Sequence, residues 1–189
     1  MKRKGVTLFI ILAILGIAIG GYLTHLHFSN GASFCDRVPG FDCGTVNRGA
    51  YAEFPPWTFT WWIDRGLPTI PNAVMAIGAF IAMIALVTWS IKTKNPVTEH
   101  KVLKLTLVLV TIGFLFGLWL IWVQYHILQL WCLLCITLDY ILLMMELSMR
   151  QALGQGHGKL DKVVKVLLVI GIIFSLWVIW EVWIKALFA

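Results

Sequence analysis

Long apolar segments alternate with short polar ones along the chain. A helix that spans a lipid bilayer needs about 20 mostly apolar residues, and five segments reach or approach that length. The pattern therefore predicts an all-α integral membrane protein whose 189 residues form a single membrane domain. The predicted helices cover about 6–23, 70–91, 102–124, 132–148 and 163–180, and a long loop covers about 24–69.

The composition supports this class of protein. The sequence is 60% hydrophobic and 13% charged, and a soluble domain of this size could not bury so much apolar surface. The first apolar segment follows Lys2, Arg3 and Lys4, as a secretory signal peptide would. However, its apolar run is longer than a signal core and no small-x-small cleavage site follows, so we expect a retained helix.

The positions of lysine and arginine predict the orientation in the membrane. Because basic residues concentrate on the cytoplasmic side, the N-terminus and the 2–3 and 4–5 links are expected there. The long loop, the short link at about 125–131 and the C-terminus then lie outside. Since helices separate the basic charges, the net charge of +6 reflects topology and does not indicate nucleic-acid binding. Eleven of the fifteen basic residues follow this rule: Lys2, Arg3, Lys4, Lys92, Lys94, Lys101, Lys104, Arg150, Lys159, Lys162 and Lys165.

All four cysteines fall at the predicted outer face. Cys35 and Cys43 lie in the long loop, and Cys132 and Cys135 form a Cys-x-x-Cys motif where the fourth helix begins. Two structural disulfides, a four-thiolate metal site and a redox relay are the alternatives. A Cys-x-x-Cys bridge adds little stability within a helix, and a four-thiolate zinc would place a double negative charge at the membrane boundary.

The redox relay explains both positions. A flexible loop pair in water can meet a soluble protein, whereas the helical pair can meet a hydrophobic electron acceptor. Cys132 falls in the first helical turn, where free N–H groups favour a thiolate.

Three further polar residues accompany the cysteines. Asp139 and Glu146 fall within about 60° of the cysteines on the fourth helix, and Asp139 lies about 10 Å below Cys132. A carboxyl at this depth usually faces a bundle interior or cavity. Asp139 is thus either a proton donor or quinone contact, or a hydrogen-bonded structural acid, and Glu146 is assigned a structural role. Asn72 directly follows Pro71 at the start of the second predicted helix, and from this position alone we interpret it as a helix cap.

Together these residues resemble the family of vitamin K epoxide reductase and its prokaryotic disulfide-forming homologues. The resemblance covers about residues 5–150. It rests on Cys35-x7-Cys43 followed by Thr45-Val46, on Pro71-Asn72-Ala73-Val74, and on the WCLLCIT motif at 131–137. It implies a four-helix bundle around a quinone, with the fifth helix outside the bundle. No thioredoxin-like domain of the kind fused to many bacterial members follows in this sequence, so we expect a separate partner.

The resemblance also implies roles. Cys35 and Cys43 would be a shuttle pair that oxidises a thioredoxin-like or DsbA-like dithiol, and Cys43 would then attack Cys132. Cys135 would contact the quinone, and Asn72 would hydrogen-bond to a quinone oxygen. The family often has a tyrosine at position 139, so either Tyr140 or Asp139 itself would make that contact here.

The sequence thus predicts a thiol oxidase of a prokaryotic plasma membrane that generates disulfides outside the cytoplasm and reduces ubiquinone, menaquinone or a related naphthoquinone. Reduction of a naphthoquinone or quinone epoxide with the same cysteines is the close alternative. A non-enzymatic membrane metal-binding or assembly protein is the alternative of another class, although no metal ligands are assigned.

Overall fold

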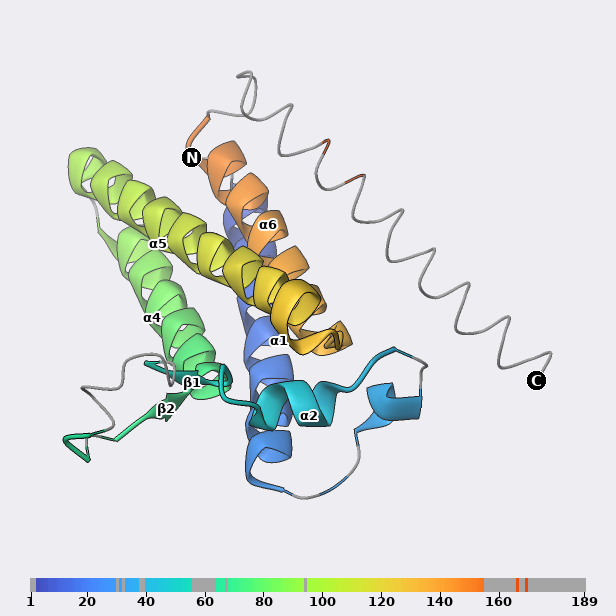
Figure 1. Ribbon diagram of the computed structural model, residues 1–189. Coiled ribbons are helices and arrows are strands. Elements are labelled where there is room, and N and C mark those ends of the chain that lie inside the picture. Colours follow the sequence, from blue (N-terminus) through green and yellow to red (C-terminus); the bar gives the residue numbers. More distant parts are fainter. Residues whose placement is uncertain are drawn as a thin grey trace.

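Four long helices form the body of the protein in a computed structural model (Figure 1). The structure describes residues 3–29, 31, 33–37, 40–55, 64–66, 68–93, 95–154, 166 and 169. Contacts join α1 to α4 and α6, and α5 to α4 and α6, so the helices form a ring in the order α1, α4, α5, α6. The helices are α1 (Arg3–Phe28), α4 (Asn72–Lys92), α5 (Pro96–Val123) and α6 (Leu133–Ala152).

Three of these helices are long and apolar enough to cross a membrane: Gly5–Phe28, Asn72–Lys92, and Pro96–Leu128, which includes the π-helical turn η2 (Gln124–Leu128). The fourth, α6, carries Asp139, Glu146 and Arg150 and is buried along most of its length. The predicted helical membrane architecture is confirmed. Apart from residues 166 and 169, the predicted fifth helix, at 163–180, lies outside the described residues.

Local signals explain where the helices begin. Asn95 caps α5, because its side chain accepts a hydrogen bond from the Val97 N–H at 3.0 Å, and Pro96 occupies the first turn. This helix therefore starts several residues before the predicted boundary at 102. That boundary marked only the start of the apolar segment. At its other end, Gln129 adopts a left-handed conformation (φ 54°) that closes the π-helical turn.

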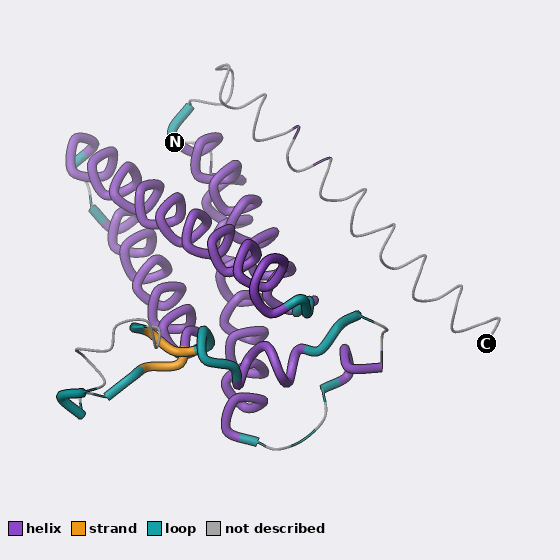
Figure 2. Tube along the Cα trace, in the orientation of Figure 1, coloured by secondary structure: helices purple, strands orange, loops and turns teal. Residues whose placement is uncertain are grey.

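The loop elements gather at one end of the bundle, away from the α4–α5 connection (Figure 2). They are η1 (Phe34–Arg37), α2 (Cys43–Arg48), and the short antiparallel strands β1 (Glu53–Phe54) and β2 (Ile70–Pro71). Between β2 and α4, the Asn72 N–H donates to the Ala52 carbonyl at 2.8 Å. The loop is thus joined to the first turn of α4 and covers this end of the bundle.

The short helix α2 is held against the C-terminal end of α1. The Arg48 guanidinium donates to the carbonyls of Ser29 and Leu26, at 2.9 and 3.3 Å, and the Asn47 amide donates to that of Leu23. The last four carbonyls of a helix have no partner within the helix, so Arg48 satisfies the Leu26 carbonyl, which would otherwise need water. This capping gives the segment that begins at Cys43 a defined position over the bundle.

Candidate redox site

The four cysteines form two pairs in different states. A disulfide joins Cys35 to Cys43, whereas Cys132 and Cys135 are free thiols with 2.8 Å between their sulfur atoms. Cys35, Cys43 and Cys132 are completely buried, with 0% of their surface exposed. The predicted open, aqueous position of the loop pair is therefore wrong, because η1 and α2 pack their cysteines against the end of the bundle. A soluble protein could reach this disulfide only after local opening.

Backbone hydrogen bonds bring the two pairs together. The Asp42 N–H donates to the Trp131 carbonyl at 2.9 Å, and the Trp131 N–H donates to the Gly40 carbonyl at 3.3 Å. Asp42 immediately precedes Cys43 and Trp131 immediately precedes Cys132, so these two backbone hydrogen bonds align the starts of α2 and α6. Cys35, Cys43 and Cys132 accordingly share one buried cluster with Leu23 and Leu134. The sequence could not show this alignment, because the two segments are about 90 residues apart.

The sulfur of Cys132 caps α6. It accepts hydrogen bonds from the Cys135 N–H at 3.3 Å and from the Cys135 thiol. The free N–H groups at a helix start favour negative charge on an acceptor placed there. The Cys132 N–H in turn donates to the side-chain oxygen of Gln124, at 2.7 Å, and Gln124 is itself buried. Cys132 is thus fixed by α6 on one side and by η2 on the other.

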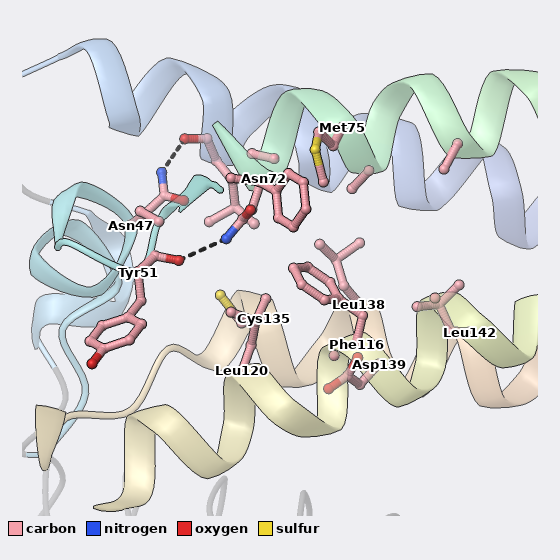
Figure 3. Close-up of a pocket in the computed structure, with 18 of the residues that line it drawn as sticks. Asn47, Tyr51, Asn72, Met75, Phe116, Leu120, Cys135, Leu138, Asp139 and Leu142 are labelled. Atoms are coloured by element: carbon pink, nitrogen blue, oxygen red, sulfur yellow. Dashed lines mark hydrogen bonds between the residues drawn. The ribbon is translucent and has the colours of Figure 1, made fainter. Parts of the chain in front are cut away.

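A cavity of about 490 Å³ lies directly beneath these cysteines, between α4, α5 and α6. Figure 3 shows Cys135 and Asn72 at the same end of this cavity, with Asp139 farther along. Most of the lining is aliphatic or aromatic, as in sites for apolar ligands. Its polar side chains are few: Asn47, Tyr51, Asn72, Gln124, Cys135 and Asp139.

Asn72 directs its amide toward Tyr51 at one end of the cavity (Figure 3). Its Nδ2 donates to the Tyr51 carbonyl at 2.8 Å, while its Oδ1 is buried and has no hydrogen-bond partner among the described residues. The side chain does not cap α4, so that part of the sequence interpretation is wrong. A buried oxygen without a partner is costly and marks a place where a polar ligand atom fits.

Asp139 reaches the cavity because α5 has a glycine opposite it. A Cβ atom added at Gly117 would lie only 1.6 Å from Asp139 Oδ1. The Asp139 carboxyl is 7% exposed and has no hydrogen bond within the described part of the chain. The neighbouring Tyr140 does not line the cavity. The structure therefore brings Asp139, rather than Tyr140, together with Cys135 and Asn72.

Glu146, which shares the polar side of α6, belongs to a different cluster. It forms an ion pair with Arg150, 2.6 Å from Nη2 to Oε1, and accepts a hydrogen bond from Thr111 at 3.3 Å. Glu146 does not line the cavity. These contacts agree with the structural role inferred from its position.

Two residues of the site had no role in the sequence prediction. Gln124 stood at the end of an apolar segment, and only the π-helical turn brings it to Cys132. Gly117 is one of several glycines in apolar segments, and only the packing of α6 against α5 shows that its missing side chain matters. The one available signal in the sequence was that Gln124 is a polar residue at the end of a membrane helix.

Replacing Gln124 with leucine is expected to destabilise the start of α6. The change would leave the buried Cys132 N–H without an acceptor, at a cost of about 1–3 kcal/mol. The measurement is the midpoint of thermal unfolding in detergent, with Gln151→Leu, on the exposed side of α6, as the matched control. Equal midpoints for the two variants would contradict the role given to Gln124.

The Asp36 carboxylate connects the two halves of the disulfide loop. It accepts hydrogen bonds from the Ser33 N–H at 2.6 Å, from the Ser33 hydroxyl and from the Gly44 N–H at 3.4 Å. Partial burial acts to raise the pKa of Asp36, but these hydrogen bonds outweigh it and hold the pKa below its ordinary value of 3.8. The loop is therefore stabilised by the ionised form.

The sign of the shift predicts an acid-sensitive loop. Because the folded pKa is lowered, the stabilisation is present above pH 3.8 and is lost as the pH falls through the folded pKa. Reduction of Cys35–Cys43 by a water-soluble phosphine, corrected for the reagent's own ionisation, should be uniformly slow from pH 8 to about 5 and accelerate in stronger acid. Asp36→Asn should be fast throughout, and Asp64→Asn should match wild type. Acceleration that begins near neutral pH would contradict this account.

Fold and site together define a helical integral membrane protein with four cysteines at one end of an apolar cavity, three of them fully buried. The model of the vitamin K epoxide reductase family matches residues 7–148, and the chain belongs to this family. The match includes α4, α5, most of α1 and α6, and all four cysteines. No curated protein matches the chain. Membership makes the protein an oxidoreductase of a class that couples disulfide chemistry to quinones.

Proposed function

We propose that this protein is a membrane thiol oxidase that passes electrons from an extracytoplasmic dithiol protein to a quinone and generates disulfides in that partner. One observation carries the proposal. The Cys35–Cys43 disulfide and the Cys132–Cys135 dithiol are aligned by the Asp42–Trp131 hydrogen bond, and Cys135 lines the apolar cavity. Such an arrangement supports a chain of exchange steps from the loop to the cavity.

Each step in this chain exchanges one disulfide for another. A thiolate of the partner attacks the Cys35–Cys43 disulfide, and the partner leaves oxidised once the shuttle pair has taken up two electrons. The Cys43 thiolate then attacks Cys132 of an oxidised Cys132–Cys135 pair, which releases Cys135 as a thiolate. Cys35 attacks Cys43 and displaces Cys132, so the shuttle disulfide forms again and the electrons rest on Cys132 and Cys135. This is the state that the structure shows.

The cavity has the properties that a quinone would need. Its apolar walls suit a hydrophobic ring, and the unpartnered Asn72 Oδ1 and the Asp139 carboxyl are polar groups able to contact ring substituents. When bound there, a quinone would accept the two electrons and two protons that the dithiol loses. Cys135 stands at the cavity to deliver the electrons, and we assign to Asp139 the holding and transfer of a proton.

The partner we propose is a thioredoxin-like or DsbA-like dithiol protein, and the four cysteines would face it from the outer side of a prokaryotic plasma membrane. The uneven distribution of lysine and arginine supports this orientation. Which of ubiquinone, menaquinone or another naphthoquinone is used would follow from which one is retained by the purified protein.

Turnover assays test the direction of electron flow. The purified protein in lipid nanodiscs is supplied with a reduced thioredoxin-like protein and either a quinone or a quinone epoxide. Loss of quinone absorbance with matching oxidation of partner thiols is the expected result. Turnover with the epoxide alone would replace the proposal with the quinone-epoxide reductase alternative.

Metal analysis tests the alternative of another class. Purified protein with one zinc or copper per chain, and with four free thiols on titration, would favour a metal-binding protein and overturn the relay. We expect two free thiols in the isolated protein, since Cys35 and Cys43 are joined.

A further inference from the structure

A chain of close polar contacts in the disulfide loop ends on one of its two sulfur atoms. Ser33 is buried, with 3% of its surface exposed, and its hydroxyl oxygen lies 3.1 Å from Cys35 Sγ. The same hydroxyl donates its hydrogen to the Asp36 carboxylate, which also accepts the Ser33 N–H. Nothing in the relay outlined above uses Ser33 or Asp36.

The direction of these hydrogen bonds determines what Ser33 can offer to Cys35. A serine hydroxyl has one hydrogen, and a carboxylate is its strongest available acceptor. With that hydrogen given to Asp36, the oxygen presents lone pairs to Cys35 Sγ. A protonated thiol can donate to those lone pairs, whereas a thiolate cannot, and the negative charge of Asp36 lies one link away. Both effects favour the protonated form of Cys35.

The chain is asymmetric with respect to the two cysteines. In the described part of the loop no hydroxyl group hydrogen-bonds to Cys43 Sγ. The charged groups around this part of the loop are Arg37, next in sequence to Asp36, and Arg48 of α2, whose guanidinium lies close to Gly44. Two carboxylates also lie near Cys43: Asp42 accepts the Thr45 N–H, and Asp36 itself accepts the Gly44 N–H. The Ser33 hydroxyl is therefore the contact that distinguishes the two sulfur atoms. Cys43 also directly follows Asp42, whose N–H is bonded to the Trp131 carbonyl, so Cys43 is the loop cysteine placed next to the start of α6.

We propose that Ser33 and Asp36 determine which sulfur of the reduced shuttle pair carries the negative charge, so that Cys35 keeps its proton and Cys43 is the thiolate. The inference rests on the proposed function of Cys35 and Cys43 as a shuttle. It makes both Ser33 and Asp36 positioning residues, since Ser33 acts through Cys35 and Asp36 acts through Ser33.

A negative charge confined to Cys43 gives the first exchange step a direction. When a partner thiolate attacks Cys35 Sγ, a bond forms between these two sulfur atoms and the Cys35–Cys43 bond breaks. The electron pair of the broken bond leaves on Cys43 as a thiolate, which is the better leaving group of the two. This thiolate is then already in place to attack Cys132, while the partner's second thiolate displaces Cys35, which takes up a proton.

The same contacts also stabilise the short helix η1, so a Ser33 or Asp36 variant could make the loop cysteines more accessible. The test therefore needs a measurement that greater accessibility alone would not change. The pH midpoint of alkylation meets this need, because it reports the thiol pKa, whereas accessibility changes the maximal rate. The protein used is the full chain in nanodiscs, with Cys132→Ala and Cys135→Ala so that only the shuttle pair reacts. After reduction, iodoacetamide labelling of Cys35 and Cys43 is followed separately by mass spectrometry from pH 6 to 10.

The expected midpoint for Cys35 is at least about one pH unit above that for Cys43. Ser33→Ala should lower the Cys35 midpoint by about one unit, which is about a tenfold faster reaction at pH 7, and leave Cys43 unchanged. Asp36→Asn should act in the same direction, because the neutral amide removes the negative charge one link from Cys35 and is a weaker acceptor for the Ser33 hydrogen. Ser33→Thr should retain the wild-type profile.

Equal midpoints in the otherwise unmodified loop would overturn the inference. So would a Ser33→Ala variant in which both cysteines shift together or neither shifts. Because no quinone or partner takes part in this experiment, its result is independent of turnover. A protein without quinone turnover that retains the asymmetric midpoints would contradict the proposed function and leave the charge assignment standing.

Discussion

Cys135→Ala is expected to stop turnover and to accumulate a disulfide between Cys43 and Cys132. Cys135 is the cysteine of α6 that lines the cavity, and its sulfur lies 2.8 Å from that of Cys132. Without it the electrons have no route to the cavity, and Cys132 can pair only with a loop cysteine. We expect a loss of quinone reduction on the order of 10³-fold or more, as for other residues that act as a unit.

The trapped species can be measured directly. Oxidised Cys135→Ala protein, digested without reduction, should yield a peptide that joins the segments around Cys43 and Cys132. Cys132→Ala is the matched control, since it removes the same number of thiols but leaves Cys43 without this partner. A Cys135→Ala protein in which Cys132 stays a free thiol, with Cys35–Cys43 intact, would indicate two independent pairs and no relay.

Gly117→Ala is expected to impair the cavity through Asp139. The new methyl carbon would lie 1.6 Å from Asp139 Oδ1, so the carboxyl or the whole of α6 has to move. Overpacking of this kind costs about 1–3 kcal/mol of stability. A displaced carboxyl would occupy more of the cavity that Cys135 also lines, and misplacement near a reacting group lowers rates by about 10²-fold. Quinone titration and steady-state turnover measure the two effects.

Two controls separate this mechanism from a general effect of alanine in a membrane helix. Gly78→Ala lies in α4, where an added Cβ meets nothing within 4 Å, and should behave as wild type. Asp139→Ser shortens the side chain, so Gly117→Ala should cost much less stability in that background. Additive losses in the double variant would show that the two residues do not act on each other.

Hydropathy determined most of the architecture in advance. Four apolar segments became the four long helices, because in lipid the backbone hydrogen bonds of a segment have to be made within the segment itself. Cys132 and Cys135 were placed together by their spacing of three, which corresponds to one helical turn. The placement of Asp139 on the same face of this helix as the two cysteines followed from the same periodicity, since position on a helix is a local property. These features needed no knowledge of neighbouring helices.

Contacts between segments that are distant in the chain could not be predicted from the sequence. The loop cysteines were expected in water, and their burial depends on Asn47 and Arg48 capping carbonyls of α1, more than 15 residues earlier. The alignment of Cys43 with Cys132 depends on one backbone hydrogen bond across about 90 residues.

The choice between Asp139 and Tyr140 also needed the tertiary structure, because it depends on the space left by Gly117. The sequence by itself determined the positions of the four helices and the spacing of Cys132 and Cys135 on one helical face, because hydropathy and helical spacing are local. Only the packing of the helices and loop decided which groups meet, because such contacts depend on shapes that no single segment contains.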